Sequence, residues 1–154
     1  MNLLRIRKAR LEDLDRIVDF NVQMAEETEG KLLDRNIVRE GVEAILKDEA
    51  KGFYLLSEYN KSGKILAGQL MVTFEWSDWR NKDFWWIQSV YVDKEYRNKG
   101  VFSRLYRTVT KMALSEESVG GLRLYVEKNN DSAKQVYESL GMEKTAYEIY
   151  EKSL

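Results

Sequence analysis

The sequence predicts an α/β (α+β) domain in which a mixed, mostly antiparallel twisted sheet of about seven strands is flanked by four helices. Short alternating apolar runs separated by polar turns predict the strands, and stretches of helical periodicity predict the helices. One helical stretch connects two apolar runs as in a β-α-β crossover. The 154 residues fit one domain of ordinary size, which we place at residues 1–154.

The first part of the chain predicts one strand and two helices. Residues 3–9 alternate apolar and charged side chains, which predicts a strand with one buried side. Apolar residues at helical spacing predict a helix over 11–27, which Gly30 ends. Asp34 is placed to cap a second helix, whose apolar face spans 37–46.

The remainder predicts a hairpin, a crossover and a short C-terminal α/β segment. A turn with Ser62 and Gly63 joins the first two strands, and Asn130 or Asp131 caps a short helix that Gly141 closes. The expected elements are, in order, strands 53–59, 65–76 and 84–93, a helix 100–115, a strand 122–126, the short helix, and terminal strands 142–144 and 146–151.

Composition limits the class of protein. Hydrophobic residues make up 44% and charged residues 33% of the chain, as in a soluble globular protein. The net charge of -1 gives no electrostatic support for nucleic-acid or membrane binding. The apolar runs are much shorter than a bilayer span, and the N-terminal residues lack the pattern of a secretory signal, so we expect a cytoplasmic protein.

The chain contains neither cysteine nor histidine. Disulfides, thiolate nucleophiles, Ser-His or Cys-His catalysis and nearly all transition-metal sites are therefore excluded, and we expect no metal. Any catalysis must use carboxylates, tyrosine, lysine, backbone amides, ordered water or a bound cofactor.

The junction around Gly100 favours an anion. A strand ends there, Arg97 and Lys99 lie in the following turn, and the first amides of the next helix have no partner within the helix. By itself this pattern is equally compatible with a plain capped turn. The spacing from Asn130 through Tyr137 to Gly141, one crossover unit downstream, favours the binding interpretation.

With these two motifs the sequence resembles the GNAT superfamily of N-acetyltransferases over nearly its whole length. The predicted order of elements is that of the family. Two positions depart from its pattern, because Phe102 replaces a small residue and Lys94 stands where proline is common. The matching positions are Val90, Val92, Arg97 and Gly100 in the first motif, and Asn130, Ala133, Tyr137 and Gly141 in the second.

The resemblance implies an acetyl-coenzyme A site. Backbone groups of 90–92 would bind the pantetheine arm as an added strand, and a backbone amide there, beside a bulge, would polarise the acetyl carbonyl. Amides of 98–103 would bind the pyrophosphate, Asn130 would bind the cofactor arm, and Tyr137 would protonate the departing thiolate. The assigned positions are Val90, Tyr91, Val92, Arg97, Asn98, Lys99, Gly100, Val101, Phe102, Ser103, Asn130 and Tyr137.

The implied reaction is direct transfer of the acetyl group to a neutral amine, so a base or a water chain must remove the proton of the amine. Because histidine is absent, carboxylates are the candidates. We select Glu75 and Asp83, near the ends of adjacent central strands, with Gln88 as a residue that holds water. The alternative for each carboxylate is a solvated hairpin surface.

The acceptor is less defined than the cofactor. All four tryptophans lie within residues 76–86 near Glu75 and Asp83. This mixture suits a cationic amine, but packing or a dimer interface explains it at least as well. The acidic turn at 26–29 is either solvated or attracts the acceptor. We expect a small-molecule amine (a polyamine, an amino acid or an aminated metabolite) and a homodimer.

Two other functions remain open at this stage. One is a non-catalytic module that binds or senses acyl-coenzyme A, and the other is a purely structural interaction domain.

Overall fold

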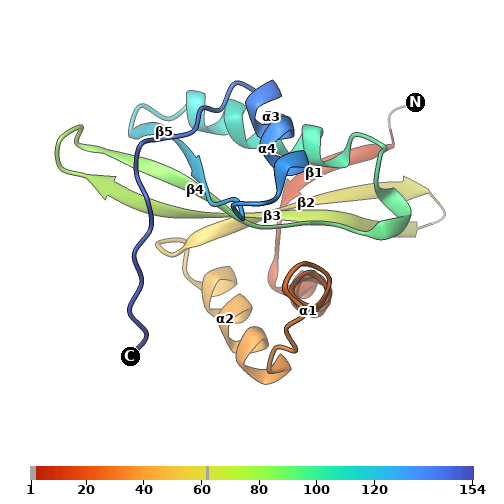
Figure 1. The fold of residues 1–154 in the computed structure, drawn as a ribbon. Coiled ribbons are helices and arrows are strands. Elements are labelled where there is room, and N and C mark those ends of the chain that lie inside the picture. Colours follow the sequence, from red (N-terminus) through yellow and green to blue (C-terminus); the bar gives the residue numbers. More distant parts are fainter. Residues whose placement is uncertain (1–2, 62) are drawn as a thin grey trace. The chain divides into compact units, whose positions relative to one another are not determined.

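A single sheet with the order β1-β2-β3-β4-β5 is formed by the residues that the computed structural model describes, which are 3–61 and 63–154 (Figure 1). Strands β1 to β4 pair antiparallel with one another, whereas β5 pairs in parallel with β4. The predicted hairpin and β-α-β crossover are therefore confirmed. Ser62 lies outside the described residues. The strands are β1 (Leu4–Lys8), β2 (Gly52–Lys61), β3 (Gly63–Ser77), β4 (Lys82–Val92) and β5 (Val119–Leu124).

Helices cover both faces of this sheet. Two helices pack on one face and the crossover helix packs on the other (Figure 1). We call these the α1 face and the α3 face. The helices that cover them are α1 (Leu14–Glu29), α2 (Arg35–Lys47) and α3 (Val101–Leu114), with short 3-10 turns η1 (Leu11–Asp13) and η2 (Lys94–Tyr96).

The predicted caps Gly30 and Asp34 on the α1 face are confirmed, whereas the helix predicted over 11–27 begins as a 3-10 turn at 11–13 and continues as α1 to Glu29. Gly30 adopts φ +62° directly after α1, a left-handed conformation that glycine enters without steric cost. The side chain of Asp34 accepts hydrogen bonds from the amides of Asn36 at 2.9 Å and Ile37 at 3.4 Å. These bonds satisfy two amides that have no partner within α2.

Apolar side chains from both helices fill the space against the α1 face, and those of α3 fill the opposite side. On the α1 face the buried cluster includes Tyr54 and Leu56 of β2. The helical members of that cluster are Leu14, Ile17, Val18, Val42 and Ile45. On the α3 face, Val101, Leu105 and Val109 recur at helical spacing and are buried. The same periodicity that predicts the helices therefore forms the core.

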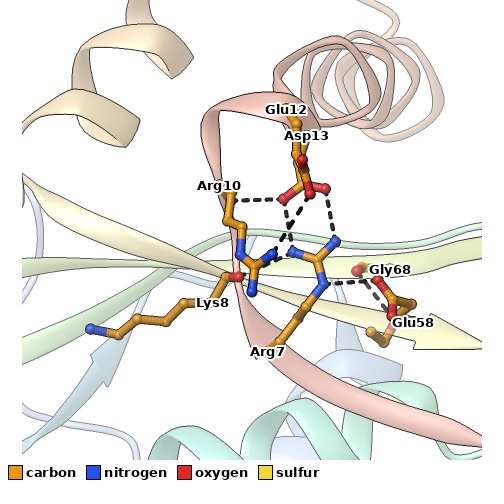
Figure 2. A network of polar contacts seen from close by, with 8 residues as sticks. Arg7, Lys8, Arg10, Glu12, Asp13, Glu58 and Gly68 are labelled. Atoms are coloured by element: carbon orange, nitrogen blue, oxygen red, sulfur yellow. Dashed lines mark hydrogen bonds and ion pairs between the residues drawn. The ribbon is translucent and has the colours of Figure 1, made fainter. Parts of the chain in front are cut away.

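An ion network is buried where β1 meets η1 (Figure 2). The Arg7 guanidinium donates two hydrogen bonds to the carboxylate of Asp13, both 2.8 Å long, and a third of 2.8 Å to Glu58. The backbone amide of Arg10 also donates to Asp13, at 2.7 Å. Exposed fractions of 13% for the Arg7 side chain, 7% for Asp13 and 2% for Glu58 show that all three charges are largely removed from solvent.

The chain divides into two compact units, Met1–Leu124 and Tyr125–Leu154. The second unit contains α4 (Asp131–Ser139), which Asn130 caps by accepting a 3.2 Å hydrogen bond from the amide of Ala133. Gly141 follows this helix with φ +89°, and the amide of Met142 donates to the carbonyl of Tyr137. Both predicted caps of this helix are confirmed.

The predicted terminal strands 142–144 and 146–151 are wrong. This described segment carries no strand, so the sheet has five strands and not about seven. Tyr147, Ile149 and Tyr150 are largely exposed. Alternation and aromatic content indicate a preference for extended backbone, but a strand exists only where a neighbouring strand completes its hydrogen bonds.

Candidate acetyl-coenzyme A site

β4 contains a bulge. Gln69 of β3 pairs with Tyr91, and Met71 pairs with Gln88. The pairing therefore advances by two residues on β3 and by three on β4, so β4 has one extra residue in this interval. Ser89, inside this interval, adopts φ +49°. The pairing of β4 with β5 ends at Ile87, one residue before the irregular region. The bulge predicted near 90–92 is thus present at the point where the β4–β5 ladder stops.

Beyond the bulge, β4 presents backbone groups at its edge. The amide of Asp93 donates to the carbonyl of Ala67 at 2.8 Å, and Tyr91 pairs with Gln69, so both face β3. Because successive residues alternate, the amides and carbonyls of Val90 and Val92 face the side where β5 no longer pairs. This edge has the geometry that an added strand requires.

A buried polar network lies behind the bulge on the α1 face. Gln69 is fully buried, and its amide nitrogen donates to Asn21 at 2.8 Å and to the Ser89 carbonyl at 3.1 Å. Asn21 donates in turn to the hydroxyl of Tyr54 at 3.1 Å. The motifs in the sequence do not point to these residues, although a polar side chain inside an apolar stripe, as at Asn21, is the signal that finds such a network.

We expect Gln69→Met to lower the free energy of unfolding by about 1–3 kcal/mol, because it leaves Asn21 and the Ser89 carbonyl without their shared donor. Urea unfolding measures this loss. Gln88→Met is the control, since Gln88 is only half-buried and its amide donates to the hydroxyl of Thr73. Equal losses for the two variants would contradict a special role for Gln69.

The loop between β4 and α3 ends in an unusual N-cap. Asn98 and Gly100 both adopt left-handed backbone conformations, with φ +59° and +75°. Gly100 caps α3 without a side-chain hydrogen bond, and its carbonyl accepts the first intrahelical bond from Arg104. The amides at the start of α3 therefore have no acceptor within the helix, which is the arrangement that binds phosphate groups.

Several side chains of this loop are turned toward the protein. Lys99 donates to the Glu95 carbonyl at 2.7 Å. Arg97 donates to the Val92 carbonyl and to Glu27. The ring of Phe102, where the resemblance expects a small residue, packs 6.1 Å from the ring of Tyr106 one turn along α3. In this loop it is the backbone, more than these side chains, that is arranged to meet an anion.

Glu75 and Asp83 do not lie together. Glu75 pairs across the hairpin with Phe84, and Asp83 pairs with Trp76, so alternation places the two carboxylates on opposite faces of the sheet. Glu75 is on the α1 face, where its carboxylate binds Arg123 at 2.7 Å. The two residues therefore cannot act as a pair.

Both carboxylates also lie far from the bulge, near the other end of the β3–β4 pair. Phe84, opposite Glu75, precedes Ser89 by five residues, which is roughly 16 Å of extended strand. Gln88, on the α1 face beside the bulge, donates to Thr73. A role for either carboxylate at the bulge therefore requires intervening water.

The remaining candidates belong to the second unit. The side chain of Asn130 accepts from the amide of Ala133 and from Ser132 while it caps α4. Tyr137 follows seven residues later, about 10 Å along the helix axis. It is half-buried, and burial raises the pKa of its phenol above the ordinary value.

Comparison with protein families shows the family of the chain. Residues 13–142 match the model of the Acetyltransferase (GNAT) family. The chain belongs to this family. The predicted membership is confirmed, and acetyltransferases of the family use acetyl-coenzyme A, for which the β4 edge and the α3 N-terminus are suited.

Similar proteins support this assignment. A solved structure described as a possible acetyltransferase from Clostridium difficile 630 is 48% identical over 99% of both chains, with a TM-score of 0.93. A second, a probable acetyltransferase, is 25% identical over 97% of both chains, with a TM-score of 0.85. Thialysine N-epsilon-acetyltransferase from Bos taurus is 30% identical over 79 residues, 51% of this chain and 45% of that protein. The chain thus spans about half the length of the curated relatives that it matches.

Two further observations concern the described residues. Among them no cluster of three or more acidic side chains is placed to hold a metal ion. Their helices also include none with the length and apolar character needed to cross a bilayer.

Proposed function

We propose that this GNAT chain is an acetyl-coenzyme A dependent N-acetyltransferase that transfers the acetyl group directly to a small-molecule amine. The observation that carries the proposal is the bulge at Ser89, which ends the β4–β5 ladder and is followed by a Gly100-capped helix. We also propose that the two compact units together form one acetyltransferase domain, because the family match spans both.

The residue roles follow from these features and from the family motifs. Backbone groups of Val90 and Val92 bind the pantetheine arm, and an amide at this edge polarises the acetyl carbonyl. Backbone amides from Asn98 to Ser103 bind the pyrophosphate. Asn130 binds the cofactor arm, and Tyr137 protonates the thiolate as the C–S bond breaks.

The attacking amine must lose a proton during transfer. The distance along β4 places Glu75 and Asp83 beyond direct reach of an amine at the bulge. We propose that water held beside Gln88 accepts the proton first, with Glu75, which shares the α1 face, as its destination. Asp83, on the α3 face, is the weaker candidate.

The acceptor is proposed as a polyamine, an amino acid or an aminated metabolite. The name of the bovine relative, an N-epsilon-acetyltransferase of thialysine, favours an amino acid side-chain amine among the three. Trp76 and Trp79 are 63% and 87% exposed on the β3–β4 hairpin, which supports either acceptor contact or a homodimer interface. We propose a homodimer in the cytoplasm.

An amine panel tests the function. We expect coenzyme A thiol to be released from acetyl-coenzyme A only when an accepted amine is present, with the acetylated amine detected by mass spectrometry. Tight binding of acetyl-coenzyme A without release across a broad panel would favour the non-catalytic sensing module. Absence of a thermal shift with acetyl-coenzyme A would favour a purely structural domain.

A further inference from the structure

The carboxylate of Glu27, at the C-terminal end of α1, is a hub for three groups from the end of β4 and the loop after it. It accepts hydrogen bonds from the Tyr91 hydroxyl at 2.9 Å and from Arg97 at 2.7 Å. The ammonium group of Lys94 lies 3.3 Å away. The side chain of Glu27 is 24% exposed, so the carboxylate keeps some access to solvent while these three partners surround it.

Arg97 links Glu27 to the proposed cofactor edge. Its Nε donates to the Val92 carbonyl at 2.9 Å while its Nη2 binds Glu27, and the guanidinium lies 5.5 Å from the centre of the Tyr91 ring. The Val92 carbonyl is on the edge of β4 that faces away from β3. Arg97 therefore binds the last carbonyl of that edge, which leaves the Val92 amide and both backbone groups of Val90 for the pantetheine arm. It also ties the loop that leads to Gly100 to the end of β4.

The charges of the cluster support each other. The hydrogen bond from Arg97 lowers the pKa of Glu27, and those from Tyr91 and Lys94 add to this against the opposing effect of burial. Burial and the neighbouring Glu27 carboxylate raise the pKa of Tyr91 to about 12. At neutral pH the hub is thus an ionised carboxylate that holds a protonated phenol and two cations.

We propose that Glu27 is a positioning residue for coenzyme A: by holding Arg97 against the Val92 carbonyl, it fixes the orientation of loop 97–100 and of the amides that follow. The inference rests on the proposed function. It also gives the Arg97 side chain a different role from a direct phosphate ligand, because its donors are directed to Glu27 and Val92.

The sign of one substitution distinguishes positioning from electrostatics. Removing a carboxylate near an anion site strengthens anion binding if charge alone matters, and it releases Arg97 toward the phosphates if Arg97 is their ligand. If Glu27 positions the loop, its removal weakens binding instead. Glu27→Gln is nearly isosteric, and Glu27→Asp keeps the charge while it shortens the reach.

Calorimetric titration of the full chain with coenzyme A tests the proposal. We expect Glu27→Gln to raise Kd by roughly two- to fivefold, the range for a partly exposed charged contact. Glu27→Asp should also raise Kd. The double variant Glu27→Gln/Arg97→Gln should have a Kd no higher than that of whichever single variant binds coenzyme A more weakly. The KM for acetyl-coenzyme A should rise with Kd, while kcat at saturation changes little.

Glu26→Gln is the matched control, because the neighbouring Glu26 is exposed and its loss changes the net charge equally. It should leave Kd unchanged or slightly lower. Unchanged or tighter binding by both Glu27 variants, with melting temperatures equal to the parent, would overturn the inference. If the parent chain itself binds no coenzyme A, the proposed function fails, and that result is distinct from failure of the Glu27 role alone.

Discussion

Replacement of Tyr137 by phenylalanine is expected to lower kcat by about 10²-fold, at the lower end of the range for loss of a general acid. The variant keeps the half-buried ring and loses only the hydroxyl, so packing around α4 is preserved. The effect should fall on kcat more than on the KM for acetyl-coenzyme A, because proton donation occurs only as the thiolate departs. Steady-state kinetics with an accepted amine measures both constants.

Tyr147→Phe provides a matched control, since Tyr147 is 78% exposed in the same unit and has no proposed role. Its kcat should equal that of the parent. The pH profile gives a second check, because burial raises the pKa of Tyr137, so the acid form of the phenol should persist to a higher pH than that of a free phenol. Unchanged turnover in Tyr137→Phe would remove the acid role.

Local patterns in the sequence were sufficient to predict the main elements. Helical periodicity, caps such as Asp34 and Asn130, and glycines such as Gly30 act over a few residues, so the sequence shows them directly. The crossover was predictable because a strand, a helix and another strand in succession favour parallel pairing. The position of the bulge came from the family resemblance and not from the residues themselves.

Features that depend on strand register, or on contacts between residues far apart in the sequence, could not be predicted. In the sequence, Glu75 and Asp83 lie at similar distances from the hairpin turn. Only their pairing, with Phe84 and Trp76 respectively, shows that the two side chains lie on opposite faces of the sheet. The contact of Glu27 with Arg97 joins residues 70 positions apart, which no local spacing reveals. The prediction of terminal strands was wrong for the same reason. Alternation of apolar and polar residues is a property of one segment, whereas a strand requires a second segment with which to pair.

The buried network around Arg7 is expected to be the most sensitive point for stability (Figure 2). We expect Arg7→Met to lower the free energy of unfolding by about 3–5 kcal/mol, because it leaves the carboxylates of Asp13 and Glu58 buried without their shared cation. Urea unfolding at neutral pH measures this. Arg10→Met is the control, since the Arg10 side chain is 67% exposed and its backbone amide still donates to Asp13, so its cost should stay below about 1 kcal/mol.

The pH dependence of the Arg7→Met effect tests its cause. In the parent, burial alone would raise the pKa of Asp13, but hydrogen bonds from Arg7 and the Arg10 amide outweigh it and lower this pKa. That contribution is therefore complete above the unfolded pKa of about 3.9 and is lost as pH falls through the folded value. Without Arg7, burial favours the protonated carboxyl of Asp13. Lowering the pH therefore reduces the destabilisation of the variant, while it lowers the free energy of unfolding of the parent. The difference in stability between the two proteins should narrow from pH 7 to pH 3, and a difference independent of pH would show that lost packing, not the buried charges, causes the destabilisation.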